Sequence, residues 1–180
     1  ALKANSDSGL KGFSEIDYVP PTKRSSRYLE LVRRNARGTP NSLRLARHSP
    51  TTVTRFRKIQ GMCGPGAQLS DKDRKHLEMK KQALTVLSPT HPGSTVTTLP
   101  DDILHYSEPR ILTVRENARL QSFPDWFRFL GKYTSGGKAR RHDCPRYSQV
   151  GNAVPPLFAE AVGIILQQIL RGKIGKNASL

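Results

Sequence analysis

The chain has 180 residues, enough for one ordinary domain or for a small domain with part of another. Hydrophobic residues make up 36% and the mean hydropathy is −0.55, so we expect a modest core and a large exposed surface. Thirty Lys and Arg against 14 Asp and Glu give a formal charge of +16, which points first to nucleic acid and second to an anionic membrane as a partner.

Two further properties of the sequence exclude other classes. No run of about 18 apolar residues occurs and the N-terminus lacks a signal-peptide core, so we expect neither a membrane span nor secretion. Cys63 and Cys144 have no CxxC partner, which indicates a reducing compartment and neither a disulfide scaffold nor a zinc site. We therefore predict an intracellular protein, in the cytoplasm or nucleoid of a bacterium or in the nucleus of a eukaryote.

Residues 1–40 have the weakest structural pattern, and we expect a basic, partly irregular linker. Tyr28, Leu29 and Val32 group at helical spacing, which predicts a short helix from about Ser26 to Ala36, stopped by the glycine and proline that follow it. The arginines of this helix either contact phosphates or form a solvated face.

Residues 41–61 combine basic and apolar side chains. The run Thr51–Thr54 favours a strand or the start of a short helix that continues through Phe56 and Ile59, and the pattern does not decide between them. The glycines of residues 61–66 predict a loop, in which Cys63 has no local base and is expected to be a passive thiol. The candidate DNA contacts here are Arg44, Arg47, Arg55, Arg57 and Lys58.

Three elements are predicted between residues 71 and 98. Asp71–Gln82 is a charged helical candidate and Leu84–Leu87 favours a short strand. Ser94–Thr98 is a hydroxyl-rich extended run, in which Thr95 and Thr97 either donate to phosphates and base edges or face water on an edge strand.

The sequence signals for secondary structure are stronger after Pro100. Thr113 and Glu116 form a Thr-x-x-Glu capping box that starts a helix at about Val114. Arg115 and Glu116 are adjacent and cannot pair along one helix face, whereas Arg115 and Arg119 share a face. An aromatic cluster follows at Trp126, Phe127 and Phe129.

Residues 131–145 are rich in Gly, Lys and Arg, which suits either a phosphate contact or an insertion. The basic candidates in this loop are Lys138, Arg140 and Arg141. His142, Asp143 and Cys144 are contiguous, and three consecutive residues make poor metal ligands, so we expect no metal site.

Residues 149–156 join this loop to the most apolar helical segment. Gly151 and Asn152 tolerate positive φ, and Pro155 and Pro156 suit the first turn of a helix from about residue 157 to residue 171. Backbone amides and the Asn152 side chain would then lie at a helix end that favours a polar ligand. The simpler interpretation of the spacing alone is that the turn only starts a core helix.

Two sequence blocks in this half of the chain form a specific joint pattern. Residues 115–125 have the sequence Arg-Glu-Asn-Ala-Arg-Leu-Gln-Ser-Phe-Pro-Asp, and residues 147–156 have Tyr-Ser-Gln-Val-Gly-Asn-Ala-Val-Pro-Pro. Together they resemble the last two motif blocks of the DNA (cytosine-5)-methyltransferases, in order. The match is close from Arg110 to Gly163. Residues 91–106 are similar to the segment that leaves the target-recognition domain of that family, and residues 44–67 resemble its variable part only loosely.

Other blocks of the same family are missing from this sequence. The Phe-x-Gly-x-Gly cofactor loop and the Glu-Asn-Val block are absent. The Pro-Cys-Gln nucleophile segment is also absent, because neither cysteine has the required neighbours. A clean Gln-x-Arg-x-Arg is absent as well. The chain therefore resembles the C-terminal part of a methyltransferase, either as a fragment or as the second subunit of a split enzyme.

The resemblance implies distinct roles for the residues that carry it. The whole enzyme flips a cytosine out of the duplex, attacks C6 with a cysteine thiolate assisted by a glutamic acid at N3, and methylates C5 from S-adenosylmethionine. Those catalytic groups would lie outside this chain. Asn152, Ala153 and Val154 would contact the cofactor, and Arg115, Glu116 and Arg119 would organise the structure.

We accordingly predict an α+β fold divided into three parts. Residues 1–40 form the linker, residues 41–106 a small, irregular, mostly β target-recognition region, and residues 107–180 helices that complete a Rossmann-like α/β methyltransferase domain. The expected partners are double-stranded DNA and an N-terminal methyltransferase portion, which would cover the apolar face of residues 157–171. The alternative is a non-enzymatic basic DNA-binding protein in which the two blocks are relics or coincidence.

Overall fold

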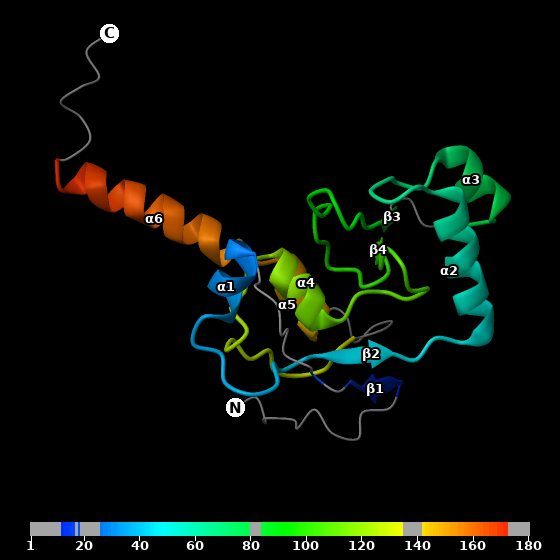
Figure 1. The fold of residues 1–180 in the computed structure, drawn as a ribbon, viewed down its shortest axis with the longest axis horizontal. Coiled ribbons are helices and arrows are strands. Elements are labelled where there is room, and N and C mark those ends of the chain that lie inside the picture. Colours follow the sequence, from blue (N-terminus) through cyan, green and yellow to red (C-terminus); the bar gives the residue numbers. More distant parts are fainter. Residues whose placement is uncertain (1–11, 17, 19–25, 80–83, 135–141, 173–180) are drawn as a thin grey trace, which may run out of the picture.

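The computed structural model describes residues 12–16, 18, 26–79, 84–134 and 142–172 (Figure 1). Within these ranges the chain is an α+β structure of short strands and mostly short helices. In chain order the elements are β1 (Phe13–Glu15), α1 (Arg27–Arg33), β2 (Arg44–Ala46), α2 (Pro50–Met62), α3 (Asp71–His76), β3 (Thr85–Val86), β4 (Ile103–Leu104), α4 (Val114–Leu120), α5 (Arg146–Gly151) and α6 (Pro156–Leu170).

The four strands form two small sheets. β1 and β2 are antiparallel, with Phe13 opposite Ala46, and β3 and β4 are parallel, with Thr85 opposite Ile103. In the second sheet the amide of Thr85 donates to the carbonyl of Asp102 at 2.8 Å. β3 falls inside the strand predicted at residues 84–87, which confirms that prediction.

The expectation that residues 41–106 are mostly β is wrong. α2 and α3 contain 13 and 6 residues, whereas β2, β3 and β4 contain 3, 2 and 2. The alternatives left open at Thr51–Thr54 are decided in favour of helix, because Ser49 caps α2 by accepting from the amide of Thr52 and Pro50 occupies the first turn. Capping and burial of Phe56 on the inner face of α2 outweigh the strand preference of the threonines.

Two other predicted elements differ from the structure. α3 ends at His76, with Glu78 at a φ of 50° just beyond it, and the predicted continuation to Gln82 falls partly outside the described residues. Residues 94–98 are irregular and do not form an edge strand. The Thr97 hydroxyl donates to the Asp102 carboxylate instead of facing water.

The buried side chains form one cluster that runs from α2 to α5. It includes Ile59 of α2, Leu104 of β4, Val114 and Ala118 of α4, and Val150 of α5. Buried residues of the ranges 41–106 and 107–151 thus belong to a single core. The division between these ranges stays a prediction.

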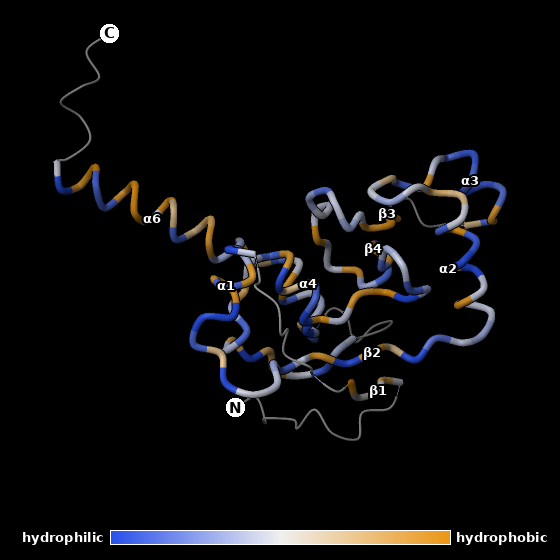
Figure 2. The backbone as a smooth tube through the Cα atoms, viewed as in Figure 1, coloured by the Kyte–Doolittle hydropathy of each residue, from blue (hydrophilic) through white to orange (hydrophobic). Residues whose placement is uncertain are grey.

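α6 is the longest helix of the described residues, and it is largely exposed. It begins at Pro156, within the proline pair that was predicted to start it, contains 15 residues and has no buried residue. Figure 1 shows it projecting from the packed body, and Figure 2 shows apolar residues recurring along its length. Phe158, Val162, Ile165 and Ile169 are all exposed and follow helical spacing, so the expected uncovered apolar face is present.

Candidate functional site

Arg115 is fully buried and is held mainly by oxygen atoms of the chain. Its Nε donates to the carbonyl of Asn41 at 2.8 Å, and its Nη2 donates to the carbonyl of Phe127 at 2.6 Å. Nη1 donates to the carbonyl of Pro124 at 3.2 Å and lies 4.0 Å from the carboxylate of Asp125. One arginine of α4 therefore joins the segment before β2 to the aromatic segment after α4.

Arg119 occupies the same face of α4 and pairs with a buried carboxylate. Its Nε and Nη2 donate to the two oxygens of Asp125 at 2.9 and 2.7 Å. Burial alone would lower the pKa of Arg119, but the bonds to Asp125 raise it overall. Asp125 in turn donates its amide to the carbonyl of Val32 in α1 at 2.7 Å, so this pair fixes α1 against α4. The predicted shared face of the two arginines is confirmed.

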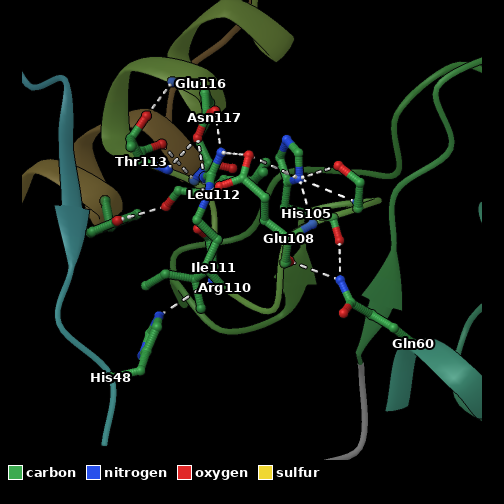
Figure 3. A network of polar contacts seen from close by, with 12 residues as sticks. His48, Gln60, His105, Glu108, Arg110, Ile111, Leu112, Thr113, Glu116 and Asn117 are labelled. Atoms are coloured by element: carbon green, nitrogen blue, oxygen red, sulfur yellow. Dashed lines mark hydrogen bonds and ion pairs between the residues drawn. The ribbon is translucent and has the colours of Figure 1, made fainter. Parts of the chain in front are cut away.

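Glu116 points away from Arg115 and completes the predicted capping box. The amide of Thr113 donates to Glu116 at 2.7 Å, and the amide of Glu116 donates to the Thr113 hydroxyl at 3.0 Å. Arg110 reaches both oxygens of Glu116, at 2.8 and 3.0 Å, as Figure 3 shows. Burial alone would raise the pKa of Glu116, but the bonds and charge of Arg110 lower it overall. Glu116 is therefore an organising carboxylate held in its ionised form.

The same network attaches α2 to the loop before α4 (Figure 3). The amide nitrogen of the Gln60 side chain donates to the carbonyls of His105 and Glu108 at 2.7 and 2.8 Å. His48 Nε2 accepts from the amide of Ile111 at 3.4 Å. Burial, followed by the charge of Arg110, lowers the pKa of both His48 and His105. The loop thus contacts His48 and contains His105, and the lowered pKa of each favours its neutral form.

Glycine is required at position 151 because the backbone of residues 97–98 approaches it closely, and not because of a positive φ. Gly151 is the last residue of α5, a helix that the sequence analysis did not predict. A Cβ atom at this position would lie 2.3 Å from the carbonyl oxygen of Thr97. The glycine therefore allows the end of α5 to pack directly on residues 97–98.

The turn after Gly151 also differs from the expectation of free amides at a helix start. The amides of Asn152 and Ala153 donate to the carbonyls of Ser148 and Val150 at 3.0 and 3.2 Å, so both complete the end of α5. The N-cap of α6 is Pro155, which has no side-chain cap bond. The side chains of Asn152 and Val154 are exposed, Val154 by 63%. A ligand at this turn would meet these side chains before any amide of α5.

α2 carries exposed basic side chains. Arg55, Arg57 and Lys58 are exposed, whereas Phe56 and Ile59 of the same helix are buried. Beside them, α2 and α3 border a hollow lined by Thr51, Thr54, Arg55, Lys58, His76, Leu77 and Glu78. We call Arg55, Arg57 and Lys58 the α2 basic surface.

Two other features bear on metal and membrane binding. No group of three or more His, Cys, Asp and Glu side chains is placed to hold a metal ion within the described residues. The helical segment Arg146–Leu170 is long and apolar enough to cross a membrane by length and composition. Its first part, α5, is however packed in the core through Arg146 and Tyr147, and α6 alone has 15 residues against the about 20 that a span needs.

Comparison with known proteins connects this framework to one family. Residues 11–168 match the family model of the C-5 cytosine-specific DNA methylases. The type II methyltransferase M.AquIB of Picosynechococcus sp. is 39% identical over 127 residues, which are 68% of this chain and 85% of M.AquIB. The chain belongs to the C-5 cytosine-specific DNA methylase family.

The matches cover very different shares of the relatives. The type II methyltransferase M.XorII of Xanthomonas oryzae pv. oryzae is 43% identical over 77 residues, which are 43% of this chain but 16% of M.XorII. The DNA (cytosine-5)-methyltransferase CMT1 of Oryza sativa subsp. japonica is 45% identical over 71 residues, which are 39% of this chain and 6% of CMT1. This methylase chain therefore spans most of one short relative and a small part of longer ones.

The predicted DNA contacts of this methylase chain differ in their surroundings. Arg44 is buried, so its prediction as a DNA contact is wrong; Arg44 and Ala46 share one face of β2, and Ala46 packs against the core. Thr97 is bound internally through Asp102, whereas Arg47, the α2 basic surface and Thr95 are exposed. Lys138, Arg140 and Arg141 lie outside the described residues.

The sequence pattern indicated no role for three residues of the buried framework, which are Asn41, Ser42 and Arg146. The structure buries Ser42 and Arg146 completely. The only available signal was position, because Arg146 directly precedes the second of the two family blocks.

Proposed function

We propose that this chain is the C-terminal portion or subunit of a DNA (cytosine-5)-methyltransferase. It supplies DNA target recognition and one wall of the S-adenosylmethionine pocket, and it is inactive alone. The observation that carries the proposal is the uncovered α6 directly beyond the exposed Asn152–Val154 turn. The catalytic cysteine and the glycine-rich cofactor loop come from a separate chain or from an upstream portion.

The apolar surface of α6 supports a missing protein neighbour. Phe158 is 62% exposed and Ile165 is 51% exposed, and each such side chain would contribute about 1.5–3 kcal/mol on full burial. M.XorII and CMT1 are mostly made of residues that this chain does not match, whereas M.AquIB is a short chain like this one. A Rossmann-like α/β domain that α6 completes accounts for both the exposed face of α6 and the partial match to the longer relatives. This domain would belong to a second chain or to another part of the same chain.

At the proposed cofactor wall, the groups available to the cofactor are side chains of residues 152–154. The Asn152 carboxamide has donor and acceptor atoms for the polar groups of S-adenosylmethionine, and the exposed Val154 and adjacent Ala153 offer apolar contact. These groups fit a ligand that has both polar and apolar parts. S-adenosylmethionine would supply the methyl group for C5 of a flipped cytosine. The role of this chain is to bind and orient the cofactor, since the nucleophile lies elsewhere.

For target recognition, we assign residues 41–106 to the DNA. The α2 basic surface and Arg47 are exposed cations of this region, and Thr95 is an exposed hydroxyl. Arginine and lysine neutralise phosphates in a salt-dependent manner, and arginine also reads guanine in the major groove. Arg115 holds this region to residues 107–180 through Asn41, whereas Glu116 and Arg119 organise residues 107–180 through Arg110 and Asp125. Residues 1–40 form the linker.

The direct test is reconstitution. The chain is mixed with a methyltransferase polypeptide that carries the glycine-rich loop and the Pro-Cys-Gln segment, and transfer of labelled methyl to cytosine is measured. We expect activity in the mixture and in neither part alone. No activity from folded partners that co-purify would contradict the proposal and would favour a DNA-binding protein without enzymatic function.

Two variants sharpen this test. Ile165→Glu places a charge on the apolar face of α6 and should abolish co-purification, whereas Gln167→Glu adds the same charge at a polar position and should not. Asn152→Ala should raise the KM for S-adenosylmethionine and leave DNA affinity unchanged. An equal loss of cofactor and DNA binding would show that the turn is structural only.

A further inference from the structure

The two family blocks are joined inside the protein by a dipeptide that belongs to neither. Asn41 and Ser42 precede β2 and meet two buried arginines, Arg115 of the first block and Arg146 immediately before the second. The carbonyl of Asn41 accepts from Arg115 Nε at 2.8 Å, and the hydroxyl of Ser42 accepts from Arg146 Nη1 at 2.9 Å. The amide of Arg115 donates to the carbonyl of Ser42 at 3.1 Å. α4 and α5 are thus attached to the same two residues.

Ser42 has an unusual conformation that its hydroxyl explains. It is completely buried and has a φ of 68°, in the left-handed region that favours glycine. The hydroxyl accepts from Arg146 and donates to the side-chain oxygen of Asn41 at 2.9 Å. Glycine would suit the backbone but would lack this bridge. The side chain is therefore retained for its contact with Arg146.

Arg146 holds the beginning of α5. It is the first residue of the helix, and its amide donates to the carbonyl of Lys132 at 2.9 Å. Its Nε donates to the carbonyl of Gly131 at 2.9 Å, and the guanidinium lies 4.5 Å from the centre of the Tyr133 ring. α5 has 6 residues and its N-cap, Pro145, makes no side-chain cap bond. Arg146 therefore replaces a cap as the anchor of this short helix.

The other end of α5 leads directly to the exposed turn. Gly151 packs on Thr97, and Asn152 follows it as the C-cap. Between the two ends, the Tyr147 hydroxyl donates to the carbonyl of Leu112 at 2.7 Å. Because α5 is a helix of only 6 residues, fixing its first residue also fixes the position of the Asn152–Val154 turn at its other end.

We propose that Ser42 and Arg146 are positioning residues for the Asn152–Val154 turn. The bond from Arg146 to the Ser42 hydroxyl fixes the axial position and rotation of α5, and thereby the direction of the Asn152 side chain. The cofactor role of the turn rests on the function proposed above, whereas the hold on α5 does not. Ser42 also begins the segment that leads through β2 to α2, so the cofactor turn and the α2 basic surface share one attachment.

The test uses Ser42→Gly in the full chain, because glycine keeps the left-handed backbone and removes only the side chain. Amide hydrogen exchange is measured for residues 147–154 and for α4. We expect exchange in residues 147–154 to accelerate about two- to tenfold, the factor for loss of one ordinary hydrogen bond. α4 should not change, because its bond to the Ser42 carbonyl remains. Unchanged exchange in residues 147–154 overturns the positioning role.

Ser122→Gly is a matched control. Ser122 is also buried and has a φ of 61°, but its hydroxyl accepts from the amide of Leu157 at 3.1 Å, at the start of α6. Its loss should accelerate exchange in α6 and leave residues 147–151 unchanged. Equal acceleration of residues 147–151 in both variants would show a general loss of stability and would overturn the specific hold of Ser42 on α5.

A conservative variant supplies the functional readout in the reconstituted enzyme. Arg146→Lys keeps the charge, but its single ammonium group cannot reproduce the forked contacts of the guanidinium with Gly131 and Ser42. We expect both Arg146→Lys and Ser42→Gly to raise the KM for S-adenosylmethionine several-fold with little change in the KM for DNA. Faster exchange with an unchanged cofactor KM would support the hold on α5 and would count against the cofactor role of the turn.

Discussion

Arginine performs two different tasks in two regions of this chain. Arg115 and Arg146 are completely buried and donate mainly to carbonyl and hydroxyl oxygens, so each joins segments that are far apart in the sequence. Arg55 and Arg57 of α2 are exposed. A guanidinium has five donors in a rigid fork, which suits both the bridging of several carbonyls and the binding of phosphates. Surroundings, rather than residue type, decide which task is performed.

The contrast between buried and exposed arginines changes the interpretation of the net charge of +16. A basic composition suggests a polyanionic partner, but part of this charge is internal structure. Arg115, Arg119 and Arg146 donate to carbonyl and carboxylate oxygens inside the protein, so we expect them to keep these contacts with DNA present. Only exposed cations can contribute to phosphate binding.

Arg115→Ala should give the largest effect on stability. The substitution removes a buried side chain and leaves the carbonyls of Asn41, Pro124 and Phe127 without this donor. We expect the free energy of unfolding to fall by about 3 kcal/mol or more, measured by urea denaturation. Arg57→Ala is the matched exposed control and should change it by less than about 0.5 kcal/mol. Similar losses in both would remove the distinction between the two regions.

Gly151→Ala tests the same framework through a close contact. The added methyl group would meet the Thr97 carbonyl, and we expect a loss of about 1–3 kcal/mol in unfolding free energy. Gly163 of α6 has nothing within 4 Å of an added Cβ, so Gly163→Ala should stabilise α6 by up to about 1 kcal/mol. Thermal denaturation followed by circular dichroism compares the two. An unchanged unfolding free energy in Gly151→Ala would mean that residues 97–98 are not held against α5.

The sequence predicts those parts of the fold that depend on local signals. The capping box of Thr113 and Glu116 and the proline start of α6 are correct because each signal acts within a few residues. The helix at residues 50–62 remained undecided, because the run Thr51–Thr54 suits either a strand or the start of a helix; the structure shows a helix capped by Ser49. Ser42 and Arg146 were missed, since their roles arise from a contact across 104 positions. Arg44 was misplaced for a related reason: the packing of one face of β2 against the core is not a local property.

His105 in the loop before α4, and His48 that contacts this loop, should make the stability depend on pH. Burial and Arg110 lower the pKa of His48 and His105 in the folded state, so the unfolded chain binds protons more readily below about pH 6.5. Stability should therefore fall as the pH decreases through this range. The lowered pKa of Glu116 adds a second loss below about pH 4.5. In urea denaturation from pH 8 to 4, the double variant His48→Gln, His105→Gln should flatten the first decrease. A decrease unchanged by that variant would assign it to other groups.

The smallest effect on stability, and a clear one on DNA binding, is expected at the α2 basic surface. The double variant Arg55→Gln, Lys58→Gln removes two exposed charges and should change the unfolding free energy by less than about 0.5 kcal/mol. Each phosphate contact contributes about 1 to the slope of log affinity against log salt, so the slope should fall by about 2. Titration of fluorescent duplex DNA at several salt concentrations measures it.

The matched control removes the same charge elsewhere. Arg37 follows α1 and Arg171 follows α6, and both are exposed. Figure 1 shows α1 and α6 away from α2. The double variant Arg37→Gln, Arg171→Gln should leave the slope nearly unchanged. Equal decreases in the two double variants would mean that DNA responds to the total charge of the chain. In that case exposure alone would not distinguish a recognition surface, and the comparison of the two kinds of arginine would apply to stability but not to DNA binding.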